Sequence, residues 1–403
     1  MFNSDDRIRS VLHVADSSAG GGAEQVYRAT VDATQRADIE TTSYIGSGSR
    51  NPLSYIFSWR HCAAVKALIG RQSPDVVHLH NFYHVLSPSV LFGIRRARRA
   101  GWRGTVVFTA HDYHIVSPNS GFQRFARGVA INLDLNGSVL RPWWRYDRRS
   151  WVHSMLKLLQ HVLAYRVLKL SREIDLFLTP SDFTKAVLES HGHSPVKLHR
   201  NAMSNEFSSP DAPPHVVPPT PQLAYFGRLS PEKGLVEAVS ALDELLEGGE
   251  IPAGLEFHIY GLGTEESRIR EASAKARKLK VVFHGFAEHE QLGAELRGMT
   301  AFILPSRWYE VSPLSILEAA GAGLPVVVPD QGGLGETARH TTQPFLYQVG
   351  DRASFGSALR GAIAAGERNT LVDPSLFTLE CFEANLLQFY ETARLSVGRR
   401  QLR

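Results

Sequence analysis

The sequence predicts an α/β protein with doubly wound parallel sheets, and three observations support this prediction. Short, nearly continuous apolar runs recur along the chain, as expected of parallel strands that are covered on both faces. Helical segments lie between these runs, and such alternation of strands and helices is typical of α/β folds. A proline-rich stretch at residues 208–222 separates two series of this kind, which indicates two domains joined by a linker.

The strands and helices of this prediction can be read from the apolar pattern. The expected strands are RSVLHVAD (9–16), PDVVHLH (74–80), GTVVFTAHD (104–112), IDLFLTPS (174–181), QLAYFGRL (222–229), LEFHIYG (255–261), VVFHGF (281–286), TAFILPS (300–306) and LPVVVPD (324–330). The expected helices are EQVYRATVDATQ (24–35), HCAAVKALIGRQ (61–72), SDFTKAVLESHG (181–192), LVEAVSALDELLEGG (235–249), EESRIREASAKARKL (265–279) and SPLSILEAAGAG (312–323).

Composition limits the class of protein. The chain has 403 residues, of which 43% are hydrophobic and 21% charged, as in an ordinary globular protein with room for two or three domains. Two cysteines give no disulfide framework, which suits a reducing compartment. The N-terminal residues lack the apolar core of a signal peptide, and no apolar run approaches the roughly 18 residues of a spanning helix. We therefore expect a cytoplasmic protein, at most peripheral on the inner face of the cell membrane.

Two basic clusters stand out against a mild net charge of +4. The first is RRARRAGWR (95–103) and the second is RPWWRYDRRSW (141–151). No nucleic-acid-binding motif accompanies either cluster, so no nucleic acid is expected as a partner. The aromatic second cluster allows two interpretations: docking on an anionic membrane, or an ordinary packed or solvated insertion.

In doubly wound sheets ligands bind beyond the carboxyl ends of the strands, so the residues that end each strand are the candidates for chemistry. In the second half, GRLSPEKGL follows a strand and places Arg228 and Lys233 around a turn before a helix. Two cations beside a helix N-terminus would make an anion site; the alternative is two exposed cations on a loop. Gly261 and Gly263 follow the next strand and could belong to a phosphate loop, although a lone GxG is weak evidence.

A helix start follows the strand at 300–306. Ser312 is the expected N-cap and Pro313 the expected first helical residue. The first amides of this helix, which include those of Leu314 and Ser315, have no partner within the helix and would point toward a bound ligand.

Two glutamates flank this helix start. Glu310 lies just ahead of it, and Glu318 lies in its second turn. A carboxylate accepts hydrogen bonds from pairs of hydroxyls, such as those of a sugar ring or a ribose. The alternative is that Glu310 is a solvated loop residue and Glu318 a residue of the helix surface.

The first half has a glycine-rich loop and several histidines at its strand ends. Three glycines let the backbone approach a ligand before a helix expected to begin near residue 23, namely Gly20, Gly21 and Gly22. His111 and Asp112 end one strand, and His78, His80 and Asn81 end another. A flexible turn and satisfied core histidines are the alternatives, but several histidines at strand ends on the same side of a cleft point to a ligand.

With these residues in view, the sequence resembles the retaining glycosyltransferases of family 4, which have the GT-B architecture. The resemblance extends from the glycine-rich loop to about residue 390. Its most specific element is the pair Glu310 and Glu318, which is similar to the family's E-x7-E motif. Further matches are FGRLSPEKGL (226–235), GGAE (21–24), HD (111–112), TPSDF (179–183), RNAMSNEF (200–207) and DQGGLGE (330–336). The chain departs from the usual pattern at EVSP (310–313) and GLGTEES (261–267).

The resemblance implies a role for each matching residue. Arg228 and Lys233 would hold the donor diphosphate, and Glu310 would contact the donor hexose hydroxyls. Glu318 would contact the nucleotide ribose, and His111 the donor sugar. On this basis the catalytic residues are Glu310, His111, Arg228 and Lys233, and no metal site is expected.

The resemblance also implies a fold and an activity. Two Rossmann-like domains should face one another across a cleft: an acceptor-side domain at 1–207, a linker at 208–222, a nucleotide-sugar-binding domain at 223–385, and a C-terminal helix at 386–403 that packs back on the first domain. The implied activity is retaining, metal-independent and cofactor-free transfer of a sugar from a UDP- or GDP-sugar to a glycan or polyprenyl-linked acceptor, in surface polysaccharide or glycoconjugate biosynthesis. A non-catalytic nucleotide-sugar-binding subunit, a GT-B epimerase and a phosphorylase are the alternatives; no motif marks the Schiff-base lysine of a phosphorylase.

Overall fold

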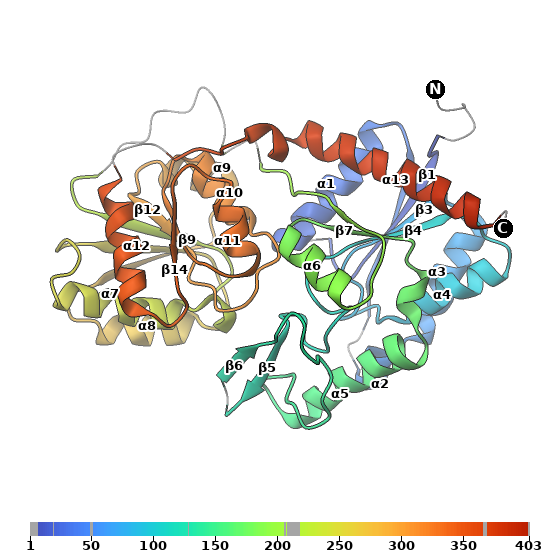
Figure 1. Ribbon diagram of the computed structural model, residues 1–403, viewed down its shortest axis with the longest axis horizontal. Helices are drawn as coiled ribbons and strands as arrows, with labels where there is room; N and C mark the ends of the chain where they lie inside the picture. The colour runs from blue at the N-terminus through green and yellow to red at the C-terminus, as the bar shows by residue number, and fades with distance from the viewer. Residues whose placement is uncertain are drawn as a thin grey trace. The chain divides into compact units, whose positions relative to one another are not determined.

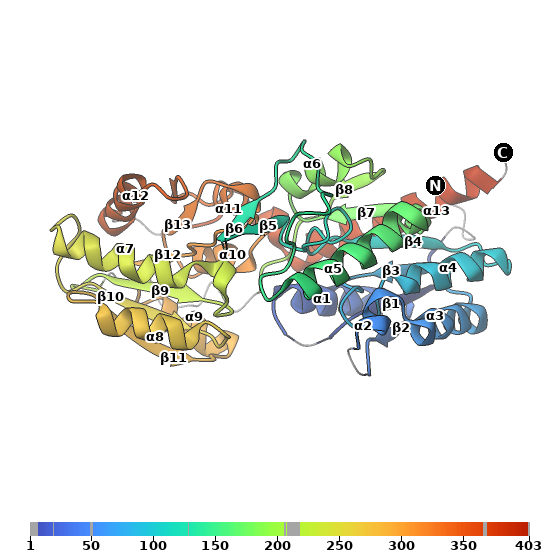
Figure 2. The same ribbon diagram turned by 90° about the horizontal axis from the view of Figure 1, so that it is seen from below.

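The chain forms two compact units, shown in Figures 1 and 2. The computed structural model describes residues 7–18, 20–48, 51–127, 129–204, 207, 218–365 and 369–401. The first unit comprises Met1–Ala202 and Leu379–Arg403, and the second comprises Met203–Thr378. The sequence placed the corresponding boundaries at 207 and 385. Most of the expected linker, residues 208–217, lies outside the described residues.

The first unit is built on a six-stranded parallel sheet in the order β2-β1-β3-β4-β7-β8. Its strands are β1 (Ser10–Ala15), β2 (Glu40–Ile45), β3 (Val76–Leu79), β4 (Thr105–Thr109), β7 (Leu176–Thr179) and β8 (Val196–Leu198). The side chains of β3, β4 and β7 are buried throughout, because helices cover both faces of this sheet. The strand order reverses between β1 and β3, and in doubly wound folds this switch point is where a ligand binds.

Helices and short helical turns surround this sheet. They are α1 (Gly22–Arg36), α2 (Pro52–Ile56), α3 (Trp59–Gln72), α4 (Ser89–Arg99), α5 (Trp151–His161), a π-helical turn (Val162–Val167), a 3-10 turn (Leu170–Glu173), α6 (Asp182–Ser190) and α13 (Leu379–Gln401). Helix α13 packs on α1 and β4 within the first unit (Figure 1).

The connection from β4 to β7 carries an insertion with a hairpin, β5 (Gln123–Ala126) and β6 (Val129–Asn132), followed by α5 (Figure 1). The second basic cluster of the sequence lies here. Its Tyr146 side chain is fully buried, and the Tyr146 hydroxyl donates to the Val139 carbonyl at 2.9 Å. Part of the cluster is therefore packed into the first unit.

The second unit has a six-stranded parallel sheet of its own, in the order β11-β10-β9-β12-β13-β14. Its strands are β9 (Gln222–Phe226), β10 (Glu256–Tyr260), β11 (Lys280–Gly285), β12 (Ala301–Ile303), β13 (Val326–Pro329) and β14 (Pro344–Tyr347). Its helices are α7 (Leu235–Glu247), α8 (Glu266–Lys275), α9 (His289–Leu296), α10 (Leu314–Gly321), α11 (Gly332–Ala338) and α12 (Arg352–Ala364), with 3-10 turns at Pro231–Lys233 and Pro374–Phe377. The strand order reverses between β9 and β12.

The predicted α/β class with doubly wound parallel sheets is confirmed, and all nine expected strands are present. Three strands at the outer edges of the two sheets, β2, β8 and β14, were not predicted. These strands are short or only half-buried, so their sequences lack a continuous apolar run. In the described part of the chain, none of the helices combines the length and apolar character needed to cross a bilayer.

Candidate functional site

The switch point of the second unit brings two predicted residues into direct contact. Lys233 ends the 3-10 turn after β9, and Glu310 lies in the loop after β12. Because β9 and β12 are neighbouring parallel strands, the loops at their carboxyl ends meet. The Lys233 ammonium donates to Glu310 Oε1 at 2.5 Å, and the two side chains are only 15% and 10% exposed. The solvated alternative for Glu310 is therefore wrong.

The loop before Glu310 is held by further hydrogen bonds. The Ser306 hydroxyl donates to Glu310 Oε1 at 2.8 Å, and the Gln331 side-chain amide donates to the Ser306 carbonyl at 3.0 Å. The Gly333 amide donates to the Glu310 carbonyl at 2.9 Å, and a Cβ at Gly333 would lie 2.1 Å from the Val311 carbonyl oxygen. Only glycine fits at Gly333, which explains the glycine turn of DQGGLGE.

The charge of Glu310 follows from these contacts. Burial by itself would raise the pKa of the Glu310 carboxyl, but the nearby Lys233 ammonium and the hydrogen bonds from Lys233 and Ser306 outweigh burial and hold this pKa below its ordinary value. Glu310 is therefore a carboxylate at neutral pH, and it fixes the Lys233 ammonium in one place.

Arg228 differs from Lys233 in its surroundings. Its side chain is 67% exposed and lies 3.6 Å from the Glu232 carboxylate, which also accepts a hydrogen bond from the Ser230 hydroxyl at 2.7 Å. A guanidinium in this position can move toward an anion without breaking a buried contact.

The helix start after Glu310 differs from the prediction by one residue. Pro313, not Ser312, is the N-cap, and α10 begins at Leu314. Pro313 has φ −73° and ψ 117°, so its fixed φ suits the extended N-cap conformation, and it has no amide hydrogen to leave unpaired. The Ser312 hydroxyl lies 3.4 Å from the Thr337 hydroxyl. As predicted, the amides of Leu314 and Ser315 fall in the first turn, where helix geometry provides no intrahelical acceptor.

Glu318 lies in the second turn of α10, as predicted, and its side chain is buried. The alternative of a residue on the helix surface is therefore wrong. Moving a carboxylate out of water is costly unless hydrogen bonds or opposite charges compensate for the lost hydration.

Gly261 and Gly263 have a packing role in the second unit. A Cβ at Gly261 would lie 1.9 Å from the Gly227 carbonyl oxygen, and one at Gly263 would lie 2.0 Å from that of Leu229. The Leu229 amide donates to the Leu262 carbonyl at 3.0 Å, so the loops after β9 and β10 are joined backbone to backbone. This contact positions the loop that carries Arg228.

In the first unit a pocket lies at the switch point between β1 and β3. Its lining residues are Ala15, Ser17, Ala23, Glu24, Tyr27, His80, Asn81 and His111. The pocket therefore joins the predicted His111 to the first turn of α1. That helix begins at Gly22 with Gly21 as its N-cap, and the backbone of Gly20 has φ +145°, a conformation that favours glycine.

The pocket adjoins a chain of buried and half-buried imidazoles. His111 Nε2 lies 3.0 Å from His80 Nδ1, and the rings of His80 and His78 stack with centroids 4.4 Å apart. Burial lowers the pKa of His111 to about 4 and that of His13 to about 3. Burial, together with the neighbouring imidazoles, also holds the pKa values of His78 and His80 well below the ordinary value, so these histidines are neutral at pH 7.

Asp112 does not bond to its neighbour His111 in the part of the chain that is described. Its carboxylate accepts from the Tyr83 hydroxyl and, at 2.9 Å, from the His114 amide. Burial raises the pKa of Asp112 to about 7, although the His114 amide opposes this shift. In the described residues the Asp112 carboxyl group is thus bonded to Tyr83 and His114, not to the His111 ring.

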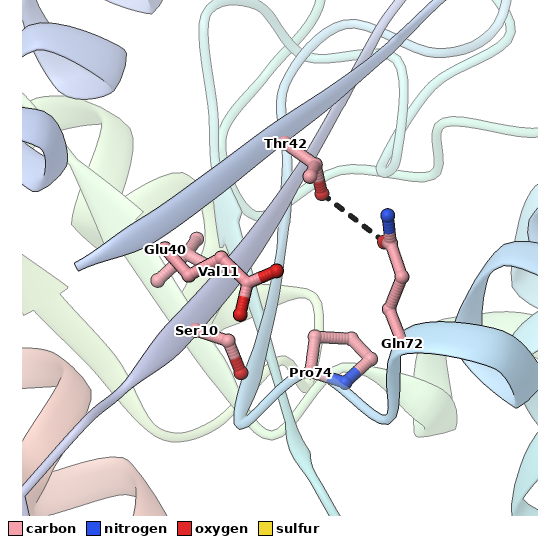
Figure 3. Close-up of a pocket in the computed structure, with 6 residues that line it drawn as sticks. All are labelled: Ser10, Val11, Glu40, Thr42, Gln72 and Pro74. Atoms are coloured by element: carbon pink, nitrogen blue, oxygen red, sulfur yellow. Dashed lines mark hydrogen bonds between the residues drawn. The ribbon is translucent and has the colours of Figure 1, made fainter.

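A second hollow, drawn in Figure 3, lies at the other end of the first sheet. It is lined by Ser10, Val11, Glu40, Thr42, Gln72 and Pro74, and the Thr42 hydroxyl donates to Gln72 Oε1 at 3.1 Å. The residues Ser10 and Glu40 begin β1 and β2, so this hollow is at the amino ends of the strands. Ligands of doubly wound sheets bind at the opposite ends, and we assign no chemistry to it.

The first basic cluster of the sequence is partly neutralised. Arg95 lies 2.7 Å from the Glu173 carboxylate, and Arg98 pairs with both Glu173 and Asp175. These pairs attach α4 to the start of β7. Ser306 and Gln331, which hold Glu310 and its loop, were not predicted as site residues, because ordinary serine and glutamine residues carry no spacing signal.

Comparison with known proteins puts these residues in context. Residues 220–364 match the family model described as glycosyl transferases group 1. The chain is 35% identical over 151 residues to a glycogen synthase of Mycobacterium tuberculosis, a match that covers 36% of each chain. It is 30% identical over 140 residues to the amylovoran biosynthesis glycosyltransferase AmsK of Erwinia amylovora, covering 33% of each chain. The matches thus span about a third of these curated relatives.

Solved structures resemble the whole chain. A sucrose-phosphate synthase of Thermosynechococcus elongatus has 17% identity and a TM-score of 0.62, with 98% of this chain and 99% of that chain covered. Anabaena Alr3699/HepE in complex with UDP-glucose has 15% identity and a TM-score of 0.58, with 95% and 99% covered. At such identities the likeness shows the fold, which is the predicted GT-B class.

Proposed function

Since residues 220–364 identify the chain as a member of the glycosyl transferases group 1 family, we propose that it transfers a sugar from a nucleoside-diphosphate sugar to a glycan or lipid-linked acceptor. The observation that carries the proposal is the largely buried pair Lys233 and Glu310 at the switch point of the second sheet. The pair offers a fixed cation for phosphate and a carboxylate for hydroxyls, next to the first amides of α10.

The donor is proposed to bind along these groups. Its diphosphate contacts Lys233, Arg228 and the amides of Leu314 and Ser315. Glu310 accepts from hydroxyls of the sugar, and Glu318 from those of the ribose. The structural neighbour Alr3699/HepE was solved in complex with UDP-glucose, which supports a UDP-sugar as the first donor to test.

The transfer is proposed to retain the anomeric configuration. An inverting enzyme needs a general base behind the anomeric carbon. Here Glu310 is already bonded to Lys233 and Ser306, and burial lowers the pKa of His111 to about 4, which makes its imidazole a weak base. In the retaining route the departing phosphate oxygen accepts the acceptor's proton on the side from which it leaves. Lys233 and Arg228 stabilise the charge that grows on this oxygen.

His111 is proposed to contact the donor sugar from its own unit. Its ring lines the pocket beside the start of α1, and its Nε2 is hydrogen-bonded to His80 Nδ1. A neutral imidazole in this state can donate or accept at Nδ1, which suits a sugar hydroxyl.

The acceptor is proposed to be a growing glycan at the surface of the inner membrane. Support comes from AmsK, whose name assigns it to the biosynthesis of amylovoran. A face of α5 offers a means of membrane contact: Trp151, Val152, Met155 and Leu159 lie on one side of this helix and are 53%, 67%, 44% and 49% exposed. Helix α2 packs beside α5 (Figure 2), and its Leu53 is 81% exposed.

Charge near this face favours an anionic membrane. The exposed Arg141, Arg148 and Arg149 precede α5 in the chain, although Arg149 pairs with Asp147 at 3.0 Å. Aromatic residues prefer the membrane interface, and arginines near it are attracted to anionic lipid. We define the exposed residues of α5 as the α5 face.

A screen of UDP- and GDP-sugars against membrane extract, with product mass and NMR of the anomeric coupling, tests the function. A glycosylated product with the donor's configuration supports the proposal. An α-linked donor that gives a β-linked product would contradict the retaining mechanism. Nucleotide binding without turnover would indicate a non-catalytic subunit, and conversion of the donor to its epimer without an acceptor would indicate an epimerase.

A further inference from the structure

Three histidines of the first unit gather at the switch point of its sheet. His13 lies on β1 and His78 on β3, and they are partners in the parallel register. His80 follows two residues after His78, so it lies on the same face of the strand. All three side chains are buried, at 0%, 0% and 1% exposure, and one ring nitrogen from each lies within 4.8 Å of the others.

Hydrogen bonding fixes the tautomer of His13. Its Nε2 lies 3.2 Å from the Thr34 hydroxyl oxygen, and this hydroxyl donates its own proton to the Val31 carbonyl at 2.7 Å. The Thr34 oxygen can therefore only accept from His13, so Nε2 carries the hydrogen. The other nitrogen, His13 Nδ1, is then a bare lone pair, and it is buried without a hydrogen-bond partner among the described residues.

His80 repeats this arrangement. Its Nδ1 is engaged with His111 Nε2 at 3.0 Å, and its Nε2 is buried without a partner in the described ranges. The third ring, His78, has hydroxyl partners on both sides: Tyr390 at 2.6 Å from Nδ1 and Thr109 at 2.8 Å from Nε2. For His78 to bind a metal ion, one of these hydroxyl oxygens must move away, which for Nε2 requires rotation of the Thr109 side chain about its Cα–Cβ bond.

These contacts match what a metal-binding imidazole needs. In known sites the nitrogen that does not bind the metal is held by a hydrogen bond, which orients the ring. Each of the three histidines has such a hydrogen bond here. Thr34 holds His13, His111 holds His80, and the hydroxyl of Tyr390 or of Thr109 holds His78. Orphaned polar atoms in a buried site also call for an explanation, and two of them, His13 Nδ1 and His80 Nε2, belong to this cluster.

We propose that His13, His78 and His80 form a binding site for one borderline transition-metal ion such as Zn²⁺. Three histidines with a fourth position open to water are an established zinc ligand set, with Zn–N distances of about 2.0–2.1 Å. The ring nitrogens must move closer together than 4.8 Å to reach these distances. The pocket lined by His80, Tyr27 and His111 borders the cluster at His80 and is the proposed entry for the ion and the water.

The site connects to the pocket residue His111. A metal ion on His80 Nε2 leaves the hydrogen on Nδ1, which then donates to His111 Nε2. His111 must in turn carry its hydrogen on Nδ1. Metal binding would thus fix the tautomer of His111 without the metal contacting the sugar donor. The metal site itself does not depend on the proposed transferase activity.

Metal titration of the full-length, chelator-treated protein tests the site. Competition with a chromophoric chelator should give one tightly bound Zn²⁺ per chain, and Co²⁺ should give the visible absorption of a tetrahedral site. His13→Asn and His80→Asn should each weaken Zn²⁺ binding at least tenfold, since each removes one of three ligands. His199→Asn is the matched control, because His199 is a buried histidine of the same unit outside the cluster.

Two further readouts keep the test decisive if a variant folds poorly. Zn²⁺ should raise the melting temperature of the wild type and of His199→Asn but not of His80→Gln, since a ligand that binds only the folded state stabilises it. A wild-type protein that binds Zn²⁺ no more tightly than His13→Asn does, or that gives only the octahedral Co²⁺ spectrum, would overturn the proposal.

Discussion

Lys233 Nζ lies 2.5 Å from Glu310 Oε1, although the two residues are 77 positions apart in the chain. Neighbouring parallel strands bring their loops together, and the Ser306 hydroxyl completes the contact at 2.8 Å. The ammonium offsets the burial of the carboxylate and keeps it charged, and the carboxylate holds the ammonium in one place. This pair therefore presents a fixed positive charge and an oriented acceptor on the same side of the second sheet.

Removing either cation should weaken catalysis. We expect Lys233→Ala and Arg228→Ala each to lower kcat/KM by about 2–4 kcal/mol of transition-state stabilisation, the scale of a lost preorganised donor. Lys233→Arg should retain more activity than Lys233→Ala because it keeps the charge. Steady-state kinetics measure the loss, and the exposed Lys278→Ala serves as the control.

The stability of the two variants distinguishes a loss of catalysis from a loss of folding. Lys233→Ala leaves Glu310 buried without its cation, and breaking a buried pair costs about 3–5 kcal/mol. Arg228 is largely exposed, so Arg228→Ala should leave the melting temperature nearly unchanged. Near-wild-type kcat/KM in both variants would contradict the assignment of these residues to the diphosphate.

The two glutamates should differ in which kinetic constant they affect. Glu310→Ala should lower kcat more than it weakens nucleotide binding, because Glu310 is proposed to contact the sugar. Glu318→Ala should weaken nucleotide binding more, because its proposed partner is the ribose. Calorimetric titration with the free nucleoside diphosphate, beside kcat, separates the two. Equal effects on both constants in both variants would contradict the proposed roles.

Chelation should leave the transferase reaction intact. Two cations and the N-terminus of α10 can stabilise a diphosphate as Mg²⁺ does in other enzymes. Activity is measured after treatment with EDTA and removal of the chelator. A complete loss that Mg²⁺ or Mn²⁺ restores would contradict this expectation. A small change on adding Zn²⁺ would instead reflect the histidine site.

The α5 face should bind anionic vesicles. We expect sedimentation with vesicles that contain anionic lipid at low salt, with weaker binding at high salt because the Debye length falls to about 3 Å at 1 M. Trp151→Ser should reduce binding, since it removes an exposed aromatic from the face. Phe286→Ser is the control, because Phe286 is 68% exposed in the other unit. Absence of binding at low salt would reject the membrane contact.

Acid should destabilise the first unit. Burial lowers the pKa of His161 to about 3 and the pKa values of His193 and His199 to about 4, whereas the unfolded chain takes up these protons near pH 6.5. The unfolded state therefore binds more protons between these values, so stability is complete above pH 6.5 and is lost as the pH falls toward 4. Each histidine contributes up to about 1.4 kcal/mol per pH unit to this loss.

His161→Asn provides the matched measurement. His161 Nδ1 lies 3.2 Å from the His114 carbonyl, and an asparagine amide can supply the same donor without titrating. Urea unfolding at pH 7, 6 and 5 measures the free energy of unfolding. As the pH falls, this free energy should decrease less steeply in the variant than in the wild type, by up to about 1.4 kcal/mol per pH unit, which corresponds to one proton. Identical slopes would show that His161 does not titrate on unfolding.

Elements buried on both faces could be predicted from the sequence because their apolar runs are continuous. The site residues Arg228, Lys233, Glu310 and His111 could be identified because they follow such strands directly, and the family resemblance added their roles. The edge strand β2 was missed because ETTSYI is only half-buried in the sheet. The start of α10 was misplaced by one residue because Ser312 has a favourable N-cap side chain, yet Pro313 takes that position.

Local sequence pattern is enough to set which strands and helices form and which polar residues end the strands. Which of these residues meet depends on the tertiary structure. Strand order joins Lys233 to Glu310, and it places His13 beside His78 and close to His80. It also gives Gly261 and Gly263 a packing role, because their loop lies against the backbone of the loop after β9. Contacts between distant segments depend on sheet order and burial, which no local run of residues encodes.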